Sequence, residues 1–443
     1  MQSTQDVEAW KFPAIKTIVS VATTPKTFKA TQTQEERIYY GVYFYPYTRP
    51  GDDPVFAVVG GTEVLIIRPN DMNGFEIIMA FQDDGFGGGG GLSAGCWTVD
   101  KHTGAPLLAV GGSGSVVKIL DIWQGECVQT LTGHGEELMD LVTSPIDQSI
   151  IVTTGADTTI RFWSLDPAHQ KQPCSIICAG EDHRETVLTI AFHHTGRYLL
   201  SGGMDHSVNL WVIPEDAGEM AGTDKPKRIM YPHFSTAMIH TNYVDCVAFH
   251  GDYILSRAAD ENIIVLWAIQ NFSSKDPPPG PELAPTTHEY RDTRSAFGGS
   301  FERLLQFQAN DTIPFYMHFN LFASPGHHPL LAMGATTGRV YLWDLYMIEQ
   351  YGRGAGIGDD VASSVPPARE SSCSVTPGAG TPAPGKVHVK RDDISELFGK
   401  VRPHATLEFK QAKGGVRHIA FSNDGRYMVA VGHMSQINIC KRW

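Results

Sequence analysis

A pattern of short apolar strands recurs along this 443-residue chain, and no other feature limits the fold as strongly. Each copy has an alternating apolar strand, a turn, a second apolar strand, a small-residue turn containing Asp, and a third strand ending in Trp. The clearest copies are residues 139–163 and 188–211, whose closing Trp163 and Trp211 lie 48 residues apart. Apolar residues with a period of two, separated by Gly and Asp turns, are typical of antiparallel strands.

Seven copies of this pattern can be aligned, although only four of them end in Trp. A repeat of about 40–45 residues that closes on Trp is typical of WD repeats, each of which forms one blade of four strands. Propellers close with four to eight blades, so the copies predict an all-β, seven-bladed WD-type propeller. The remaining copies are residues 245–267, 315–343, 40–67, 93–121 and 417–440.

The last copy contains only three strands, because the chain ends at Trp443. Its fourth, outer strand must then come from another part of the chain, and residues 27–31 lie just before the first copy. We therefore predict that 27–31 pairs with the last blade and closes the ring. This divides the chain into an N-terminal extension, 1–26, and a propeller, 27–443.

Three insertions interrupt the predicted ring. Residues 214–236 are polar, and residues 271–300, which contain three consecutive prolines, are expected to have little regular structure. Residues 349–385 are rich in Gly, Pro, Ala and Ser, and such a composition cannot repay the entropy lost on ordering. We interpret the stretch 387–401 either as a short docking helix or as a partly ordered surface turn.

Two repeats each contain a His, a hydroxyl residue and an Asp that imitate a hydrolase triad. A catalytic site would occur once in the protein, whereas these residues occur once per blade, so we interpret them as buried hydrogen-bond sets that pin strands together. The chain has no nucleophile elbow or zincin motif, and the Gly-rich stretch 85–95 lacks the Lys-Ser/Thr of a phosphate-binding loop. The sets are His134, Thr153, Asp157 and Trp163, and His183, Ser201, Asp205 and Trp211.

The composition narrows the class of partner. With 35 Lys and Arg against 48 Asp and Glu, the net charge of −13 disfavours binding to nucleic acid phosphates and favours basic partners. No signal peptide or membrane helix is recognisable. The seven scattered cysteines indicate a reducing compartment, and Cys174 and Cys178 are spaced more widely than zinc ligands usually are, so neither a metal nor a cofactor is expected.

Equivalent positions at the starts of the first strands form a ring around one mouth of the central channel. Tyr40 and Phe315, with Tyr316 beside it, belong to blades separated by only one other, so their rings can converge. Converging aromatic faces suit a quaternary ammonium group; the alternative is that they pack against the inner strands. The ring positions are Tyr40, Ser93, Met139, Leu188, Asp245, Phe315 and Arg417.

Several segments resemble the EED/extra sex combs family of Polycomb repressive complex 2. The most specific is HFSTAMIHTNYVDC (233–246), because ordinary WD repeats lack it. The resemblance covers roughly residues 27–443, apart from the low-complexity insertions. The other matching segments are 106–119, 132–141, 202–211 and 242–257.

The resemblance implies a nuclear, non-catalytic chromatin reader and regulatory scaffold. Members of the family bind trimethyl-lysine of the histone H3 tail in an aromatic cage at the propeller mouth and signal to the methyltransferase subunit of their complex. In this chain the resemblance assigns Tyr40, Phe315 and Tyr316 to the cage. It assigns contacts with the peptide to Asp245 and Arg417, and we expect Ser93 and Met139 to contact the peptide as well.

Two positions of this site depart from the family pattern. Ser93 stands where the family has a fourth cage aromatic, and Met139 stands where it has a peptide-contacting Asn. A cage with three walls should bind more weakly, unless Phe86 of the Gly-rich loop supplies the missing wall.

The resemblance also implies protein partners. These are a helical segment of the methyltransferase catalytic subunit, held in a groove on the opposite face, and a zinc-finger Polycomb subunit of the Su(z)12 type; neither a membrane nor sequence-specific nucleic acid is expected. One alternative is a general WD-repeat scaffold, such as a ubiquitin-ligase adaptor, in which the mouth aromatics only pack. A propeller enzyme is the other.

Overall fold

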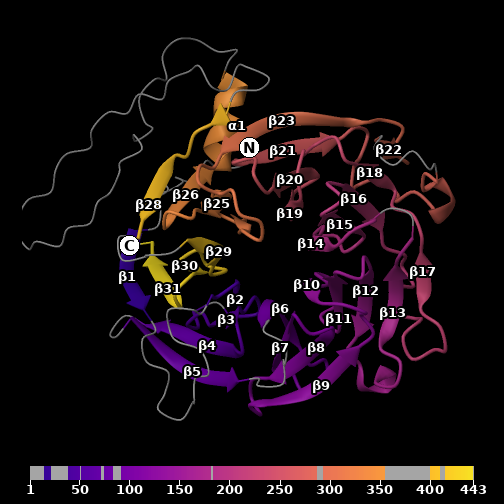
Figure 1. Ribbon diagram of the computed structural model, residues 1–443, viewed down its shortest axis with the longest axis horizontal. Helices are drawn as coiled ribbons and strands as arrows, with labels where there is room; N and C mark the ends of the chain where they lie inside the picture. Colours follow the sequence, from indigo (N-terminus) through magenta and orange to yellow (C-terminus); the bar gives the residue numbers. More distant parts are fainter. Residues whose placement is uncertain are drawn as a thin grey trace, which may run out of the picture.

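Seven β-sheets stand around a common axis and form a closed ring in the computed structural model (Figure 1). Each sheet is one blade, with one strand near the axis and its outermost strand at the rim. The predicted seven-bladed, all-β propeller is therefore confirmed. The structure describes residues 14–20, 38–49, 51–70, 74–82, 91–180, 183–286, 293–354, 400–409 and 415–442.

Blades one, two and six are antiparallel sheets of four strands. In blade six, α1 (Leu345–Gly354) follows the third strand, and the chain returns later to add the fourth. No helix in the described part of the chain is long and apolar enough to cross a membrane. The strands are β2 (Gly41–Phe44), β3 (Phe56–Gly60), β4 (Glu63–Asn70) and β5 (Gly74–Gln82) in blade one; β6 (Leu92–Val99), β7 (Pro106–Gly112), β8 (Val116–Asp121) and β9 (Glu126–Thr132) in blade two; and β24 (Phe319–Phe322), β25 (Leu330–Gly334), β26 (Arg339–Asp344) and β28 (Ala405–Glu408) in blade six.

Blades three, four and five each have a fifth strand, which a later segment adds at the rim. β17 and β27 pair in parallel with their neighbours, and β22 pairs antiparallel. The strands are β10 (Leu138–Thr143), β11 (Ile150–Gly155), β12 (Ile160–Ser164), β13 (Cys174–Cys178) and β17 (Lys227–Ile229); β14 (Val187–Phe192), β15 (Tyr198–Gly203), β16 (Val208–Val212), β18 (Phe234–Thr236) and β22 (Arg294–Ser295); and β19 (Val244–His250), β20 (Tyr253–Ala258), β21 (Ile263–Ile269), β23 (Phe301–Gln308) and β27 (Lys400–Val401).

The predicted insertions supply several of these rim strands. Residues 214–236 contain β17 and β18. In 271–300 the described residues contain only a short 3₁₀ helix, Pro281–Leu283, and β22 near the end, which agrees with the expectation of little regular structure. The exposed edge of a blade offers unpaired N–H and C=O groups, and even a two-residue segment can bond to them. Residues 355–399 lie outside the described part of the chain, and of the stretch 387–401 only β27 is described.

The last blade takes its outer strand from the N-terminal part of the chain. β1 (Ala14–Ser20) pairs antiparallel with β31 (Gln436–Lys441), and β30 (Tyr427–Gly432) and β29 (Val416–Phe421) complete the sheet. The predicted closure is confirmed, but the predicted segment was wrong. Residues 27–31 lie outside the described residues, and β1 falls within the stretch 1–26 that was assigned to an extension. Its run of β-branched residues, Thr17 to Val19, is the better strand former.

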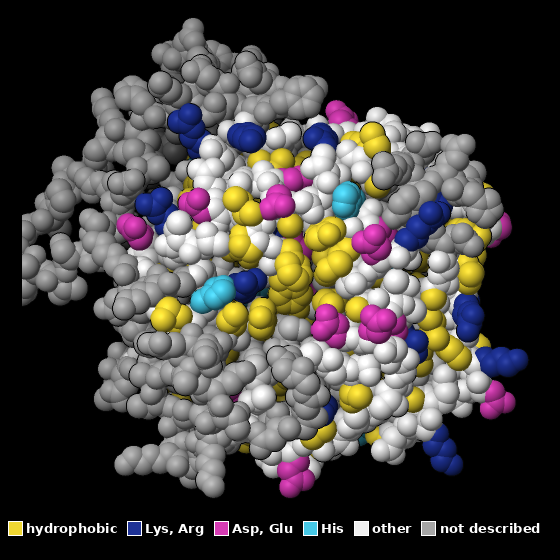
Figure 2. Space-filling view, in the orientation of Figure 1, with side chains coloured by type: hydrophobic (Ala, Val, Ile, Leu, Met, Phe, Trp, Pro, Cys, Tyr) yellow, Lys and Arg dark blue, Asp and Glu magenta, His cyan; other side chains and the backbone are white. Residues whose placement is uncertain are grey.

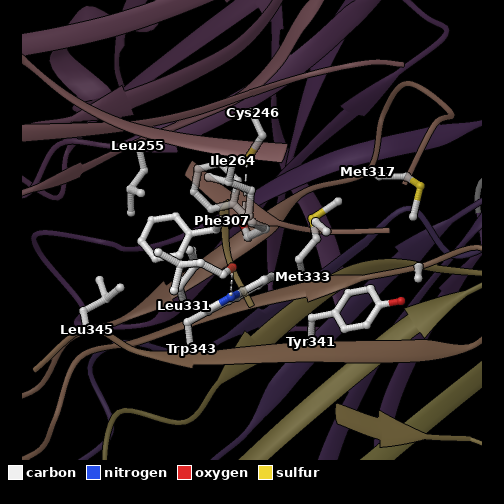
Figure 3. Close-up of a cluster of buried hydrophobic side chains, with 14 of the residues drawn as sticks. Cys246, Leu255, Ile264, Phe307, Met317, Leu331, Met333, Tyr341, Trp343 and Leu345 are labelled. Atoms are coloured by element: carbon white, nitrogen blue, oxygen red, sulfur yellow. Dashed lines mark hydrogen bonds between the residues drawn. The ribbon is translucent and has the colours of Figure 1, made fainter. Parts of the chain in front are cut away.

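Apolar side chains pack between the blades. Among the described residues, eight clusters of buried hydrophobic side chains occur: one at each of the seven interfaces between neighbouring blades, and one around Met139, Leu188 and Tyr316 near the channel. Figure 3 shows the cluster between blades five and six, where Phe307 faces Trp343 with ring centroids 5.7 Å apart. The ring is therefore held by contacts between sheets, and its centre is left for the inner strands and the side chains at their ends.

Candidate functional site

The His, hydroxyl and Asp residues of blade three form one hydrogen-bonded set. The His134 imidazole lies 3.0 Å from the Asp157 carboxylate through Nδ1 and 2.7 Å from Thr153 Oγ1 through Nε2. The Trp163 indole N–H donates to the same hydroxyl at 2.8 Å. Burial alone would raise the pKa of Asp157, but the hydrogen bond and charge of His134 outweigh it and lower the pKa well below its usual range.

Blade four repeats the arrangement with His183, Ser201, Asp205 and Trp211. Its corresponding distances are 3.0 Å, 2.8 Å and 2.9 Å. The Thr153 and Ser201 hydroxyls are fully buried, so a substrate cannot reach them. In both blades the set joins the loop before the first strand to the second and third strands, which is an architectural role.

Blade five contains a third set that the sequence prediction missed. His240 contacts Glu261 and Ser256, and the indole N–H of Trp267 donates to the Ser256 hydroxyl at 2.9 Å. Here Glu replaces Asp and stands one residue further along, which hides the pattern; the spacing from Ser256 to Trp267 was the available signal. Burial would raise the pKa of Glu261, but His240 outweighs it and lowers the pKa to about 2.

The mouth of the channel brings together residues from distant blades. The Tyr40 ring meets the Tyr316 ring edge-on with centroids 5.7 Å apart, and the Phe315 ring lies 6.1 Å from that of Tyr316. Phe315 is 45% exposed, whereas Tyr316 is 7% exposed. Figure 2 shows hydrophobic side chains gathered in the middle of the disc, flanked by charged side chains. Of the three predicted cage residues, Phe315 has the largest exposed fraction.

Tyr316 spans the channel from blade six to blade three. Its hydroxyl donates to the carbonyl of Met139 at 2.5 Å, and its ring packs with Met139 and Leu188. Burial raises the pKa of Tyr316 above its usual range, and a hydrogen bond with Ser93 opposes the rise. Ser93 and Met139, the two positions that depart from the family pattern, therefore both contact Tyr316.

Arg417 lies over the mouth from blade seven. Its guanidinium carbon is 5.6 Å from the centre of the Tyr40 ring, within the range of a cation–π contact. The same guanidinium donates to the carbonyls of Phe315 and Tyr316 at 3.1 Å and 3.3 Å, and its Nε donates to His433. Arg417 therefore ties blade seven to the residues that precede blades one and six.

Asp245 is fully buried, which does not fit its predicted contact with a peptide. Its carboxylate pairs with Arg257 and accepts the main-chain N–H of Tyr316 at 2.6 Å. A position at the start of a blade's first strand predicts that the residue lies at the mouth, but it does not predict how deeply the side chain is buried. Sequence reasoning could therefore not distinguish this carboxylate from an exposed one. Phe86 lies outside the described residues.

A metal site is not evident in the part of the chain that the structure describes. No group of three or more His, Cys, Asp or Glu side chains there is arranged to hold a metal ion. Both Cys174 and Cys178 are buried, and burial raises the pKa of the Cys174 thiol to about 11.

Comparison with known proteins agrees with this architecture. Residues 125–164 and 174–212 match the model of the family "WD domain, G-beta repeat". The Polycomb protein EED of Chaetomium thermophilum is 41% identical over 366 residues, which cover 79% of this chain and 64% of that protein. The Polycomb protein esc of Musca domestica is 32% identical over 69% of each chain.

This chain belongs to the EED/esc family of Polycomb proteins. A chain in the structure of ctPRC2 in complex with H3K27me3 and H3K27M superimposes with a TM-score of 0.83 and 35% identity, covering 98% of both chains. This chain spans slightly less than two thirds of the Chaetomium EED protein but nearly all of the chain seen in that structure. The EED/esc family therefore accounts for the whole propeller, the weak repeats included.

Proposed function

We propose that this protein is the EED-type subunit of a nuclear Polycomb repressive complex 2, and that it binds trimethyl-lysine of the histone H3 tail at the channel mouth. Tyr40, Phe315 and Tyr316 would form an aromatic cage, and binding would stimulate the methyltransferase subunit. The observation that carries the proposal is the convergence of these three rings from blades one and six at one point. Family membership and the similarity to a chain in the structure of ctPRC2 in complex with H3K27me3 and H3K27M support it.

The exposed Phe315 ring is the wall that a methylammonium group would meet first. Cation–π contacts contribute about 0.5–2 kcal/mol each, and they are strongest where water is excluded. Tyr316 is held by the Met139 carbonyl and packs against Tyr40, so the back of the cage is formed before ligand arrives. A preformed site loses less entropy on binding.

Arg417 and its neighbours would recognise the peptide around the modified lysine. The side chain of Arg417 is partly exposed at the mouth, and the net charge of −13 suits a basic histone tail. Ser93 and Met139 border Tyr316 and would line the side of the cage that lacks a fourth aromatic ring.

Phe86 is proposed as the missing wall. If it completes the cage, Phe86→Ala should weaken binding of a trimethyl-lysine peptide at least about threefold, the size of one modest cation–π contact. Isothermal titration calorimetry would measure the change. An unchanged Kd would remove Phe86 from the site and leave a cage of three walls.

The experiment that tests the proposed function compares trimethylated with unmodified H3 peptide. We expect the trimethylated peptide to bind at least about tenfold more tightly, and Phe315→Ala or Tyr316→Ala to abolish the preference. Tyr253→Ala is the matched control, because Tyr253 is 49% exposed but begins β20, next to the turn between β19 and β20 and at the far end of the strand from the mouth. Equal affinity for both peptides would favour a plain WD-repeat scaffold.

The partners follow from the same proposal. A catalytic methyltransferase subunit would place a helical segment on the opposite face, and a zinc-finger subunit of the Su(z)12 type would complete the assembly; the chain itself would be non-catalytic. Copurification with a methyltransferase tests this assignment. Adding the trimethylated peptide to the purified complex should then raise its rate of histone methylation, and no change would argue against stimulation.

A further inference from the structure

The loop that carries the cage residues of blade six is bonded at every carbonyl. We call residues 312–317, between β23 and β24, the mouth loop. All six carbonyls from Thr312 to Met317 accept a hydrogen bond. Tyr316 has a φ of +61°, a left-handed conformation that a Tyr residue rarely adopts. A surface loop usually leaves such carbonyls to water, so this one is built to keep one shape.

Arg257 makes three of these bonds from beneath the mouth loop. It lies on β20 with its side chain 1% exposed, and its guanidinium donates to the carbonyls of Thr312, Pro314 and Met317, the last two at 2.8 Å and 3.1 Å. A guanidinium suits this task because its donors point along fixed directions in one plane. The bonds run from blade five to the loop that enters blade six.

Asp245 completes the support from the neighbouring strand β19. It pairs with Arg257, and its Oδ2 accepts the N–H groups of Tyr316 at 2.6 Å and Met317 at 3.4 Å. The ion pair therefore holds both the donors and the acceptors of the mouth loop at the point where φ is positive.

We propose that Arg257, acting with Asp245, is a positioning residue for the methyl-lysine site. Neither side chain would touch the ligand; together they hold the mouth loop so that Phe315 faces solvent while Tyr316 stays against Tyr40. This inference rests on the proposed function. It assigns a purpose to a buried ion pair that the cage does not contain.

Arg257→Lys is the sharpest variant. Lysine keeps the charge beside Asp245, but its compact ammonium group cannot span three carbonyls. The double variant Asp245→Asn with Arg257→Met is the second probe, because it leaves no unpaired charge in the interior and so avoids the cost of breaking a buried pair. Arg294→Lys serves as the control, since Arg294 is another buried arginine but lies on the rim strand β22 and donates to Ser235.

The test measures hydrogen exchange of residues 309–320 in the free protein and the Kd for trimethylated H3 peptide. We expect Arg257→Lys to speed exchange of the mouth loop at least about fivefold and to weaken binding about tenfold or more. The double variant should show the same two changes, and Arg294→Lys should behave like the wild type. A melting temperature close to that of the wild type would show that the fold is intact.

Three results distinguish failure of the positioning role from failure of the proposed function. Unchanged exchange of the mouth loop in both Arg257 variants would overturn the positioning role, whether or not the wild type binds the peptide. Faster exchange with a Kd within about twofold of the wild type would overturn it as well. A wild-type protein that does not prefer the trimethylated peptide would instead overturn the proposed function.

Discussion

Blades three to five, the regular arc, and blades six, seven and one, the irregular arc, are held together by different kinds of hydrogen bond. In the first arc each blade has its own set of His, hydroxyl, acid and Trp. In the second arc the described bonds join one blade to the next: Val42 N–H donates to His418 Nδ1 at 2.9 Å, and Tyr39 N–H donates to the Gly432 carbonyl at 2.9 Å. In blade six, Met333 occupies the hydroxyl position, and the Trp343 indole donates instead to the Val401 carbonyl of an added strand (Figure 3).

The exposure of the residues around the channel mouth differs between the two arcs in the same way. The regular arc contributes Met139, Leu188 and Asp245, which are all buried. The irregular arc contributes Tyr40, Phe315 and Arg417, whose side chains are at least partly exposed. The difference teaches that the repeat pattern stabilises the ring, whereas the side chains that reach solvent at the mouth, which we propose bind the ligand, occur where blades depart from the pattern and depend on other segments.

Removal of β1 should have the largest effect, because the irregular arc depends on this borrowed strand. Deleting residues 1–22 removes the strand that pairs antiparallel with β31 and leaves the backbone edge of β31 open, which should cost on the order of 5 kcal/mol. Thermal unfolding of the truncated protein measures the loss. Deleting residues 1–12 alone, which spares β1, should leave the melting temperature nearly unchanged, and an equal loss in both proteins would contradict the role of β1.

A break in the regular arc should cost stability but not binding. His183→Ala leaves the buried Asp205 carboxylate without its imidazole and should destabilise the fold by about 3 kcal/mol. Urea denaturation would measure this loss, with His102→Ala, at an exposed turn, as the control. The Kd for trimethylated peptide should stay within about twofold of the wild type; a larger change would show that the two arcs are coupled.

Acid should weaken the regular arc through Glu261. Its folded pKa of about 2 lies below its value of 4.5 in an unfolded chain, so the unfolded state binds the proton more readily as the pH falls. The stability that this group contributes is present at neutral pH and is lost as the pH falls from 4.5 through 2. Between pH 7 and pH 3 the loss should be about 2 kcal/mol.

Glu261→Gln isolates that contribution. The variant should be less stable than the wild type at pH 7, and the difference should shrink toward pH 3 when both are unfolded in urea. A constant difference across this range would show that the Glu261 carboxylate titrates normally.

Restoring an aromatic ring at Ser93 should have the smallest effect. Ser93→Tyr adds a wall beside Tyr316 and should tighten binding of trimethylated peptide about threefold, the value of one partly exposed cation–π contact. Titration calorimetry measures the change, and Ser93→Ala should bind like the wild type. Weaker binding of the Tyr variant would mean that the Ser93 side of the cage has no room for a ring.

The repeated features of the fold could be predicted from the sequence, whereas the added strands and the burial of single residues could not. Alternating strands and closing Trp residues gave seven blades, and the aligned strand starts brought Tyr40 and Tyr316 together. Short added strands such as β22 and β27 carry no pattern, because only an open blade edge makes them strands. The depth of Asp245 and the substitution of Glu261 for Asp depend on three-dimensional packing that spacing does not record.

The central claim is that a methylammonium group sits among the rings of the irregular arc, and its N-methyl protons report this directly. When a trimethyl-lysine H3 peptide is bound to the full chain, its N-methyl NMR resonance should be shifted upfield by the aromatic ring currents of Tyr40, Phe315 and Tyr316. Phe315→Ala should reduce this shift. If the peptide binds and this resonance does not move, the methylammonium group is not in the cage and the account is wrong.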